Sequence, residues 1–380
     1  MQVLLAVRVI WRMVRTAGGE RIEPVEGATL MVACQACALE QEPVSVIVPV
    51  LNEHDRLSPC LDGLIAQGKE VVEIVVVDGG SHDGTQELVR AYLKRDLRVR
   101  LVDASPIPAT WNGKAWGLQV GLDSVNPITR WILTIDADVR PKALLTCSLL
   151  VQAKRAGLAA LSIATLQDIE GIGGGLLHPA LLTTLVYRFG MPGKILRRVS
   201  DVQANGQCFL FRRDVLEACE GFVDTRHSVC EDITIARTLV ASGYSIGFYE
   251  ARDLVSVKMY ENCRETWHNW TRSLPMRDQF LGMYTLLGWL EVALLQALPL
   301  PLLLFLVTTR MRNRWSEALN GMLLVMRIGV LFGTARAYPR RPWSYWLSPL
   351  CDLPVTVQLL RSAVQRRHVW RGRVFFRGGM

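Results

Sequence analysis

Two carboxylates stand one residue apart, at Asp136 and Asp138, directly after the apolar run 131–135. The run is typical of a strand that is buried on both faces in a parallel sheet, and ligands bind in the crevice where such strands end. Two acids there repel each other unless a cation or a hydrogen-bonding ligand lies between them. A divalent metal that carries a diphosphate meets both needs. On this triplet alone, a strand-end turn with two solvated aspartates is the simpler interpretation.

Apolar runs typical of strands alternate with helix-like runs on either side of this pair. Strands are expected at 44–50, 71–77, 99–102 and 131–135, and helices at 53–67, 83–95 and 112–123. This alternation predicts βαβ units, and therefore an α/β fold with a mostly parallel sheet and helices on both faces. The carboxyl ends of the strands then meet at one edge of the sheet.

Polar residues follow these strands at that edge. Asn52 and Glu53 can hydrogen-bond a ribose or a base, and Asp78 can accept a hydrogen bond from a base N–H. The Gly-Gly pair after Asp78 permits a tight turn and the close approach of a ligand. Lys114 opens the third helix, where the helix dipole and the ammonium group both favour a phosphate. Its simpler role is that of a solvated surface lysine.

A second pair of acids, Glu231 and Asp232, precedes the apolar helix expected at 233–240. Anions are stabilised near a helix N-terminus, so capping alone would explain Asp232. A carboxylate in this position also serves as a general base if its pKa is raised and it reaches the hydroxyl of a substrate. The residues alone leave both interpretations open.

Six motifs follow one another in a consistent order: VSVIVPVLNE (44–53), VVVDGGSHDGT (75–85), WNGKAWG (111–117), DAD (136–138), QANGQCFLFRRDVLEACEGF (203–222) and CEDITIA (230–236). Together they make the stretch 44–235 resemble the family 2 glycosyltransferases, which have the Rossmann-like GT-A fold. The resemblance implies a domain that binds a nucleotide-sugar donor.

The resemblance also implies a role for individual residues. The nucleoside would be held by Pro49, Asn52, Glu53 and Asp78, and the diphosphate by Lys114. Asp136 would lie near the ribose and a metal ion, Mg²⁺ or Mn²⁺, which Asp138 would coordinate directly. Asp232 would be the general base, and a single displacement would invert the anomeric carbon. Acceptor-side contacts are expected from Gly206, Gln207, Glu231, Trp270 and Arg272.

One motif of the family is incomplete. Processive polysaccharide synthases carry a QxxRW-type motif, and the corresponding stretch 266–270 of this chain reads TWHNW. Trp270 is kept, but the Gln and the Arg are not, and the missing charge would have to come from Arg264, Arg272 or Arg277. This departure favours the addition of a single sugar over chain synthesis. Trp267 and Trp270 fit an aromatic belt at a membrane interface equally well.

The composition favours a membrane-attached protein. Half of the residues are apolar and the formal net charge is +8. From Arg310 to the C-terminus there are 13 Arg, no Lys and two acids. These Arg residues alternate with apolar runs, which favours anionic lipid headgroups and argues against nucleic acid as the partner. Nine scattered cysteines, an odd number, favour reduced thiols on the cytosolic side.

Three parts of the chain are expected. Residues 1–42 form an amphipathic membrane-associated segment in which Arg8 and Arg12 share a helix face, 43–280 the GT-A domain, and 281–380 transmembrane or interfacial helices with a basic tail. Candidate spans are 292–309, 319–335 and 343–360, and 176–191 is expected to be an interfacial helix at a lipid-acceptor entrance. The protein would then be multi-pass, with its catalytic domain facing the cytoplasm.

The acceptor is expected to be lipophilic. The GK-W element at 113–116, TRSLPMRDQF (271–280) and WRGRVF (370–375) resemble membrane-attached hopanoid-associated, ceramide-type and carotenoid 2'-O-glycosyltransferases. The resemblance implies a hexosyl- or deoxyhexosyltransferase acting on a hydroxylated carotenoid, with hopanoid, sphingoid or polyprenyl-phosphate acceptors as the alternative. Two further classes are weighed. A nucleotidyltransferase also uses paired acids and metal but would need a Gly-rich basic signature near the N-terminus, and a non-catalytic membrane scaffold would retain only the fold.

Overall fold

The computed structural model describes residues 1–25, 42–228, 230–259, 263–270, 282–309, 313–365, 367–370 and 373–376. The chain divides into two compact units, each assembled from three separate segments. The sheet unit consists of Glu20–Leu166, Pro192–Lys258 and Arg366–Met380, and the helical unit of Met1–Gly19, Gln167–Met191 and Met259–Gln365. The division after residues 42 and 280 that the sequence predicts stays a prediction. The Cys-x-x-Cys pair at 34–37 lies outside the described residues.

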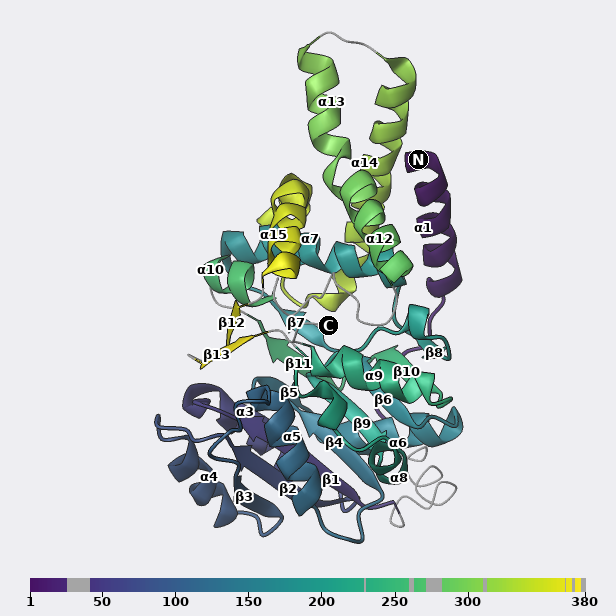
Figure 1. Ribbon diagram of the computed structural model, residues 1–380. Helices are drawn as coiled ribbons and strands as arrows, with labels where there is room; N and C mark the ends of the chain where they lie inside the picture. Colours follow the sequence, from purple (N-terminus) through teal and green to yellow (C-terminus); the bar gives the residue numbers. More distant parts are fainter. Residues whose placement is uncertain are drawn as a thin grey trace. The chain divides into compact units, whose positions relative to one another are not determined.

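An eight-stranded sheet forms the centre of the sheet unit (Figure 1). Its strands are β1 (Val44–Val50), β2 (Val71–Asp78), β3 (Val99–Asp103), β4 (Trp131–Ile135), β6 (Ala160–Ala164), β8 (Lys194–Leu196), β9 (Cys208–Arg212) and β10 (Ile246–Glu250). They lie in the order β3-β2-β1-β4-β9-β6-β10-β8. Strand β1 runs parallel to β2 and β4, and β2 parallel to β3, whereas β9 is antiparallel to both of its neighbours. The predicted α/β fold with a mostly parallel sheet is confirmed.

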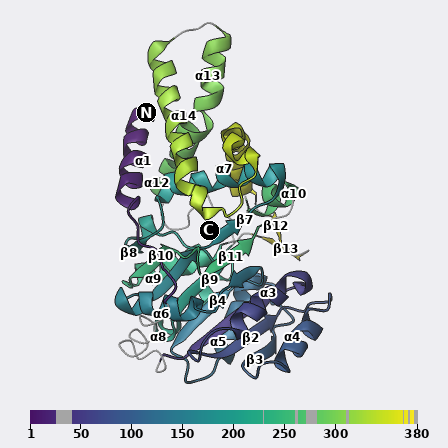
Figure 2. The same cartoon turned by 180° about the vertical axis from the view of Figure 1, so that it is seen from behind.

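Helices connect the strands of this sheet (Figure 2). They are α3 (His54–Ile65), α4 (Thr85–Leu93), α5 (Gly113–Ser124), α6 (Leu145–Arg155), α8 (Arg213–Ala218) and α9 (Glu231–Ala241), with short 3₁₀ turns η2 (Val199–Asp201) and η3 (Val223–Thr225). Strands β5 (Val139–Pro141) and β11 (Val255–Lys258) pair antiparallel beside the main sheet. Two further strands, β12 (Arg367–Trp370) and β13 (Arg373–Phe376), also pair antiparallel.

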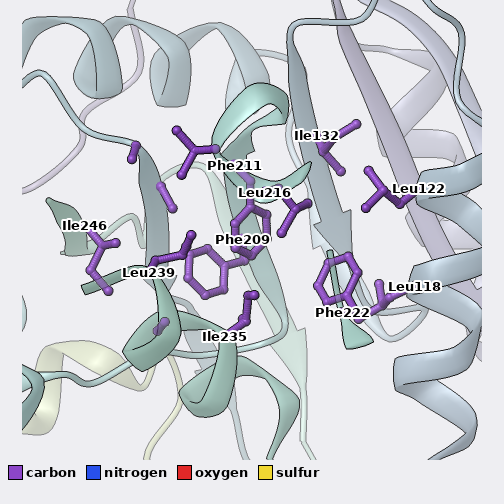
Figure 3. Packing of buried hydrophobic residues seen from close by; sticks show 14 of the residues in the cluster. Leu118, Leu122, Ile132, Phe209, Phe211, Leu216, Phe222, Ile235, Leu239 and Ile246 are labelled. Carbon is purple, nitrogen blue, oxygen red and sulfur yellow. The ribbon is translucent and has the colours of Figure 1, made fainter. Parts of the chain in front are cut away.

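A single apolar cluster fills one side of the sheet (Figure 3). Leu118 and Leu122 from α5 pack near Ile132 of β4 and Phe222. Strands alternate their side chains between the two faces of a sheet, so that Ile47 of β1 points into this cluster. Its sequence neighbours Val46 and Val48 are also fully buried. Both faces of β1 are therefore covered, as its continuous apolar sequence predicts.

The helical unit contains α1 (Gln2–Thr16), α7 (Gly171–Phe189), α10 (Cys263–Glu265), α12 (Gly282–Glu291), α13 (Pro299–Thr308), α14 (Arg314–Thr334) and α15 (Asp352–Val364). Two π-helical segments, η4 (Thr266–Trp270) and η5 (Val292–Ala297), and two 3₁₀ segments, η6 (Ala335–Ala337) and η7 (Trp343–Cys351), complete it. The short strand β7 (Leu166–Asp168) lies where the chain passes from one unit to the other.

Among the described residues, one helix is long and apolar enough to cross a bilayer, at Arg314–Ala337. A second crossing is counted only if the pair Gly282–Ala297 and Pro299–Thr308, which is bent by 43°, forms one span. The stretch 343–360, expected to be a span or a re-entrant segment, is a 3₁₀ segment that contains Pro349, followed by α15 with Pro354 in its first turn. By length and apolarity alone, these one or two helices are weak support for a multi-pass arrangement.

Helix α1 turns Arg8 and Arg12 to the helical unit together with the buried residues Leu5, Ala6 and Val9, and it turns other apolar side chains to the outside. Arg8 and Arg12 both pair with Glu291 of α12, at 2.9 and 2.8 Å, and the Glu291 carboxylate is 2% exposed. Leu4 and Val7 are 74% and 63% exposed. The two arginines do share a face, as the i, i+4 spacing predicts, but that face is turned inward because a buried carboxylate needs a charged partner.

Candidate active site

The end of β4 and the start of β9 form the floor of the site. Because β9 runs antiparallel to β4, the residues that precede it lie beside those that follow β4. The backbone N–H of Asp136 donates to the carbonyl of Gln207 at 3.0 Å. This bond holds the loop 205–207 against Asp136, although the two are far apart in the sequence.

Lys114 lies at the centre of the site. Its helix, α5, begins after Asn112, whose side chain accepts a hydrogen bond from the Lys114 backbone N–H at 3.1 Å and caps the helix. The Lys114 ammonium lies 2.7 Å from Asp136 Oδ1 and 2.7 Å from Glu231 Oε1. It also lies 3.4 Å from the carbonyl oxygen of Gly206. One lysine thus joins residues from β4, α9 and the loop before β9.

Asp232 also contacts Gly206. Its Oδ2 accepts the backbone N–H of Gly206 at 2.8 Å, and its Oδ1 accepts the N–H of Ile233 at 2.8 Å. Both Glu231 and Asp232 stand in the first turn of α9, where the helix dipole favours a negative charge. Glu231 and Asp232 thus combine a place at a helix N-terminus with proximity to Lys114.

Burial and like charges raise the pKa values of the two aspartates in this cluster. Burial raises the pKa of Asp232 to about 6, the charge of Glu231 adds to the rise, and Lys114 acts against it. Burial likewise raises the pKa of Asp136 to about 7, with Lys114 opposing and Asp138 adding to the rise. Although burial disfavours the charge of Lys114, Asp136 and Glu231 hold the pKa of this ammonium well above its usual value. A carboxylate that titrates near neutral pH suits a general base.

Asp78 is fully buried, and its carboxylate is occupied by its own turn. Its oxygens accept the backbone N–H groups of Gly80 and Ser81 and the side-chain amide of Gln86, which lies 2.7 Å away. Gly80 has φ +95°, a conformation that favours glycine. In this arrangement Asp78 shapes the turn after β2, and its expected contact with the base stays a prediction.

The turn after β1 is tied to the turn after β2. Asn52 has φ 54°, and its side-chain oxygen accepts the N–H of His82 at 2.9 Å, while its own N–H donates to Ser81 Oγ at 2.8 Å. The neighbouring Glu53 is 9% exposed and donates its backbone N–H to Thr85 Oγ1. Pro49 of β1 packs closely against α5: a Cβ built at Gly117 would lie 3.2 Å from the Cβ of Pro49. These residues lie at one edge of the sheet, as the parallel arrangement predicts.

The carboxylates of Asp136 and Asp138 fit a hard divalent cation. They follow β4 one residue apart, and the charge of Asp138 contributes to the raised pKa of Asp136. Like charges in such proximity are stabilised by a cation that accepts oxygen ligands. Within the described ranges, no group of three His, Cys, Asp or Glu side chains is arranged to hold a metal ion. A metal bound here would therefore take its remaining ligands from a bound phosphate and water, as Mg²⁺ usually does.

The expected acceptor-side residues do not all belong to this cluster. Gly206 and Glu231 contact Lys114 directly, and the side-chain oxygen of Gln207 accepts from Thr165 Oγ1 at 2.7 Å. Trp270 belongs to the helical unit, is 8% exposed and stacks on His178 with ring centroids 3.6 Å apart. Arg272 and Arg277 lie outside the described residues. Contacts between these residues and an acceptor stay predictions.

Two supporting residues were not predicted from the sequence. Asn112 places Lys114 by capping α5, and its side-chain amide donates to the carbonyl of Ser228 at 2.9 Å. Because Asn is a common helix N-cap residue, this cap could have been predicted from the sequence. Gln86, which contacts Asp78, gives no such signal because the contact depends on how α4 begins.

Comparisons with known proteins show similarity to glycosyltransferases. Residues 45–219, just under half of the chain, match the family described as Glycosyl transferase family 2. The lipopolysaccharide core biosynthesis glycosyltransferase LpsC of Rhizobium meliloti is 34% identical over 98 residues, which are 26% of this chain and 32% of LpsC. The probable glycosyltransferase YdaM of Bacillus subtilis is 24% identical over 235 residues, 61% of this chain and 54% of YdaM. Of each relative's own length, the chain thus spans about half or less.

Among solved structures, the mannosyltransferase PcManGT from Pyrobaculum calidifontis, in complex with GDP-Man and Mn²⁺, is 17% identical with a TM-score of 0.48. That alignment covers 96% of this chain and 98% of PcManGT. The sheet, with its acidic and basic residues gathered at one edge, defines an α/β domain of the GT-A class. Residues 45–219 are similar to the family described as Glycosyl transferase family 2, and they include all or most of five of the six motifs.

Proposed function

We propose that the chain is an inverting glycosyltransferase that moves a single sugar from a nucleotide-diphosphate donor to the hydroxyl of a lipophilic acceptor. The observation that carries the proposal is the shared cluster of Lys114, Asp136 and Asp232 around Gly206. A phosphate-binding cation, an acid for a metal ion and a carboxylate with a raised pKa are the groups that this transfer needs.

In this reaction Asp232 accepts the proton of the acceptor hydroxyl. The acceptor oxygen forms a bond to the anomeric carbon as the bond from that carbon to the donor phosphate breaks. The nucleoside diphosphate leaves with the electron pair of the broken bond, and the configuration of the carbon inverts. The backbone N–H of Gly206 orients the Asp232 carboxylate, and the Lys114 ammonium stabilises the charge that develops on the diphosphate.

Asp138 and Asp136 would hold the metal ion, Mg²⁺ or Mn²⁺. A divalent ion supplies charge stabilisation to a departing diphosphate without a proton transfer. The nucleoside would lie at the turns that carry Asn52 and Asp78. Because the Asp78 carboxylate is already hydrogen-bonded, we expect it to shape the nucleoside site and backbone groups of residues 79–81 to face the ligand.

This activity is tested by incubating the purified chain with nucleotide-diphosphate sugars. Release of the nucleoside diphosphate measures both hydrolysis and transfer. Activity should require Mn²⁺ or Mg²⁺, disappear with a chelator, and fall at least about a thousandfold in Asp232→Asn because the proton acceptor is lost. Binding of the nucleoside diphosphate should survive in this variant. A variant with near-normal turnover would refute the role of Asp232. Complete inactivity of the folded wild-type chain on every donor would favour the non-catalytic scaffold.

Membrane attachment is the second part of the proposal. All but two of the large apolar side chains that the structure describes as exposed belong to the helical unit; the exceptions are Leu97 and Ile128. Exposed apolar patches of this extent mark membrane or protein contacts, and the charge pattern of the C-terminal region favours anionic lipids. We therefore propose that the helical unit embeds in a bilayer and that the sheet unit faces the cytoplasm, where nucleotide sugars are made. Flotation of the full chain with anionic vesicles tests this part.

The acceptor class follows from attachment to a membrane. We propose a lipophilic alcohol, with a hydroxylated carotenoid as the first candidate because of the sequence resemblance at 271–280 and 370–375. Mass spectrometry of lipid and pigment extracts from a deletion strain decides between acceptors. Loss of a glycosylated pigment would support a carotenoid. Unchanged pigments with a missing glycolipid would select a hopanoid, sphingoid or polyprenyl-phosphate acceptor.

A further inference from the structure

The hydrogen-bonding capacity of the Lys114 ammonium is fully used. An ammonium group has three N–H donors. The Lys114 nitrogen lies 2.7 and 3.0 Å from the two Asp136 oxygens, 2.7 Å from Glu231 Oε1 and 3.4 Å from the Gly206 carbonyl. Its side chain is 18% exposed. In this arrangement Lys114 has no N–H left for a diphosphate.

The same two Asp136 oxygens are the ones that a metal ion would need. A divalent cation within bonding distance of Asp136 would lie a few ångströms from the Lys114 ammonium, and two cations at that separation repel each other strongly in a partly buried site. Lys114 and a metal ion therefore compete for Asp136 in this arrangement.

Glu231 offers Lys114 a second anchor. Its carboxylate is 10% exposed and stands in the first turn of α9, on a different element from Asp136. Release of Asp136 would therefore leave Lys114 held by its salt bridge to Glu231 and its contact with the Gly206 carbonyl, with the N–H that had faced Asp136 available. Glu231 and Lys114 both crowd Gly206, since a Cβ at that residue would lie 3.1 Å from Glu231 Oε1 and 3.1 Å from Lys114 Nζ.

We propose that Lys114 is an exchangeable internal cation, which neutralises Asp136 in the donor-free chain and releases it to the metal when the donor enters. Glu231 is the positioning residue that retains Lys114 during this exchange and directs the freed N–H to the diphosphate. The inference rests on the proposed function, because it concerns the metal and diphosphate of the same site. Its consequence is that metal and donor bind cooperatively, and that metal alone binds weakly.

Binding of Mn²⁺ without any donor tests the exchange, measured by electron paramagnetic resonance of the free ion or by calorimetry. Lys114→Met removes the competing cation, so the Mn²⁺ dissociation constant should fall by about tenfold or more. Lys114→Arg keeps the charge and should bind Mn²⁺ as weakly as the wild type. Lys69→Met is the matched control, because Lys69 is an exposed lysine of the same unit, and it should leave Mn²⁺ binding unchanged.

A folded Lys114→Met chain, checked by circular dichroism, that binds Mn²⁺ no more tightly than the wild type would overturn the inference. Glu231→Gln keeps the inference testable if Lys114→Met fails to fold. In that variant Lys114 loses its second anchor, so Mn²⁺ alone should bind no better than in the wild type. UDP or GDP added with Mn²⁺ should bind at least about fivefold more weakly. Unchanged nucleotide binding in Glu231→Gln would refute the positioning role.

Asp138→Asn separates a failure of this inference from a failure of the proposed metal site. If Asp138→Asn abolishes Mn²⁺ binding while Lys114→Met leaves it at the wild-type level, the metal site stands and the exchange by Lys114 is wrong. If Asp138→Asn binds Mn²⁺ like the wild type, the metal site of the proposed function is wrong, and the exchange falls with it.

Discussion

Gly206 donates its backbone N–H to Asp232 Oδ2 at 2.8 Å, while its carbonyl oxygen accepts from Lys114 at 3.4 Å. One residue without a side chain thus links the carboxylate proposed as the base to the cation proposed to face the diphosphate. Because the two groups share this peptide segment, a change at Gly206 should disturb both of them together.

The first prediction concerns the space at Gly206. A Cβ there would lie 3.1 Å from Glu231 Oε1 and 3.2 Å from the Cβ of Asp232, which is tighter than ordinary packing. Gly206→Ala should reduce kcat/KM by about tenfold while the chain stays folded, since the loop must shift by a few tenths of an ångström. Gly18→Ala is the control, because a Cβ at Gly18 meets no atom within 4 Å. Equal activity of Gly206→Ala and wild type would contradict this account.

The second prediction is the pH dependence of transfer. Burial and the charge of Glu231 raise the pKa of Asp232 to about 6, and only the deprotonated carboxylate accepts a proton. The value of kcat/KM should therefore rise as the pH increases through about 6 and level off above it. Glu231→Gln removes a negative charge that raises this pKa, so the acid limb should move to lower pH. A profile that is flat from about pH 5 to 8, or a limb that moves upward in Glu231→Gln, would count against Asp232 as the base.

Much of the sheet was predictable because its strands have a recognisable local sequence pattern. The runs 44–50 and 131–135 are β-branched and apolar, and the structure has strands with the same bounds at Val44–Val50 and Trp131–Ile135. The gathering of the acids and amides of the strand ends at one edge of the sheet follows from the parallel arrangement alone. The capping of α5 by Asn112 likewise follows from a local N-cap signal.

The contacts inside the site were not predictable in the same way. Lys114 and the Gly206 carbonyl are 92 residues apart, and they meet only because β9 enters the sheet antiparallel beside β4. Local patterns carry no information on such a crossing. The inward orientation of Arg8 and Arg12 depends on Glu291, a carboxylate more than 270 residues away. A local periodicity gives the shared face but not the direction in which it points.

The third prediction separates a buried ion pair from an exposed one. Glu73 is 4% exposed and accepts hydrogen bonds from Ser45 Oγ at 2.6 Å and from Arg100 at 2.6 Å. Glu73→Ala removes a buried carboxylate that also accepts the backbone N–H of Asn126, and it should lower the free energy of unfolding by about 1–3 kcal/mol. Glu87→Ala removes an exposed partner of Arg90 and should cost less than about 0.5 kcal/mol. Urea denaturation of the two variants measures the difference, and equal costs would refute the structural role of Glu73.

The fourth prediction concerns the outward face of α1. Leu4, Val7 and Trp11 are 74%, 63% and 59% exposed, while Arg8 and Arg12 of the same helix pair with Glu291 and are unable to serve as lipid-headgroup ligands without breaking that bond. The helix therefore offers hydrocarbon contacts to a bilayer, beside the exposed Arg15, whose guanidinium lies 4.3 Å from the centroid of the Trp11 ring. Replacement of these three residues by Gln should lower the partition of the full chain into vesicles by at least about tenfold, because several apolar side chains lose their hydrocarbon contacts.

Salt and a matched variant distinguish this mode of binding from simple charge attraction. The weaker partition of the triple variant, relative to the wild type, should persist at about 0.5 M salt, where surface electrostatics are strongly screened. Leu97→Gln is the matched control, since Leu97 is 97% exposed but belongs to the sheet unit, and it should leave the partition unchanged. If Leu97→Gln weakened vesicle binding as much as the triple variant, the sheet unit would have to contact lipid, and α1 would lose its proposed role as an anchor. If the triple variant bound normally, the membrane contact would have to lie elsewhere in the helical unit, first at the exposed apolar residues of α14.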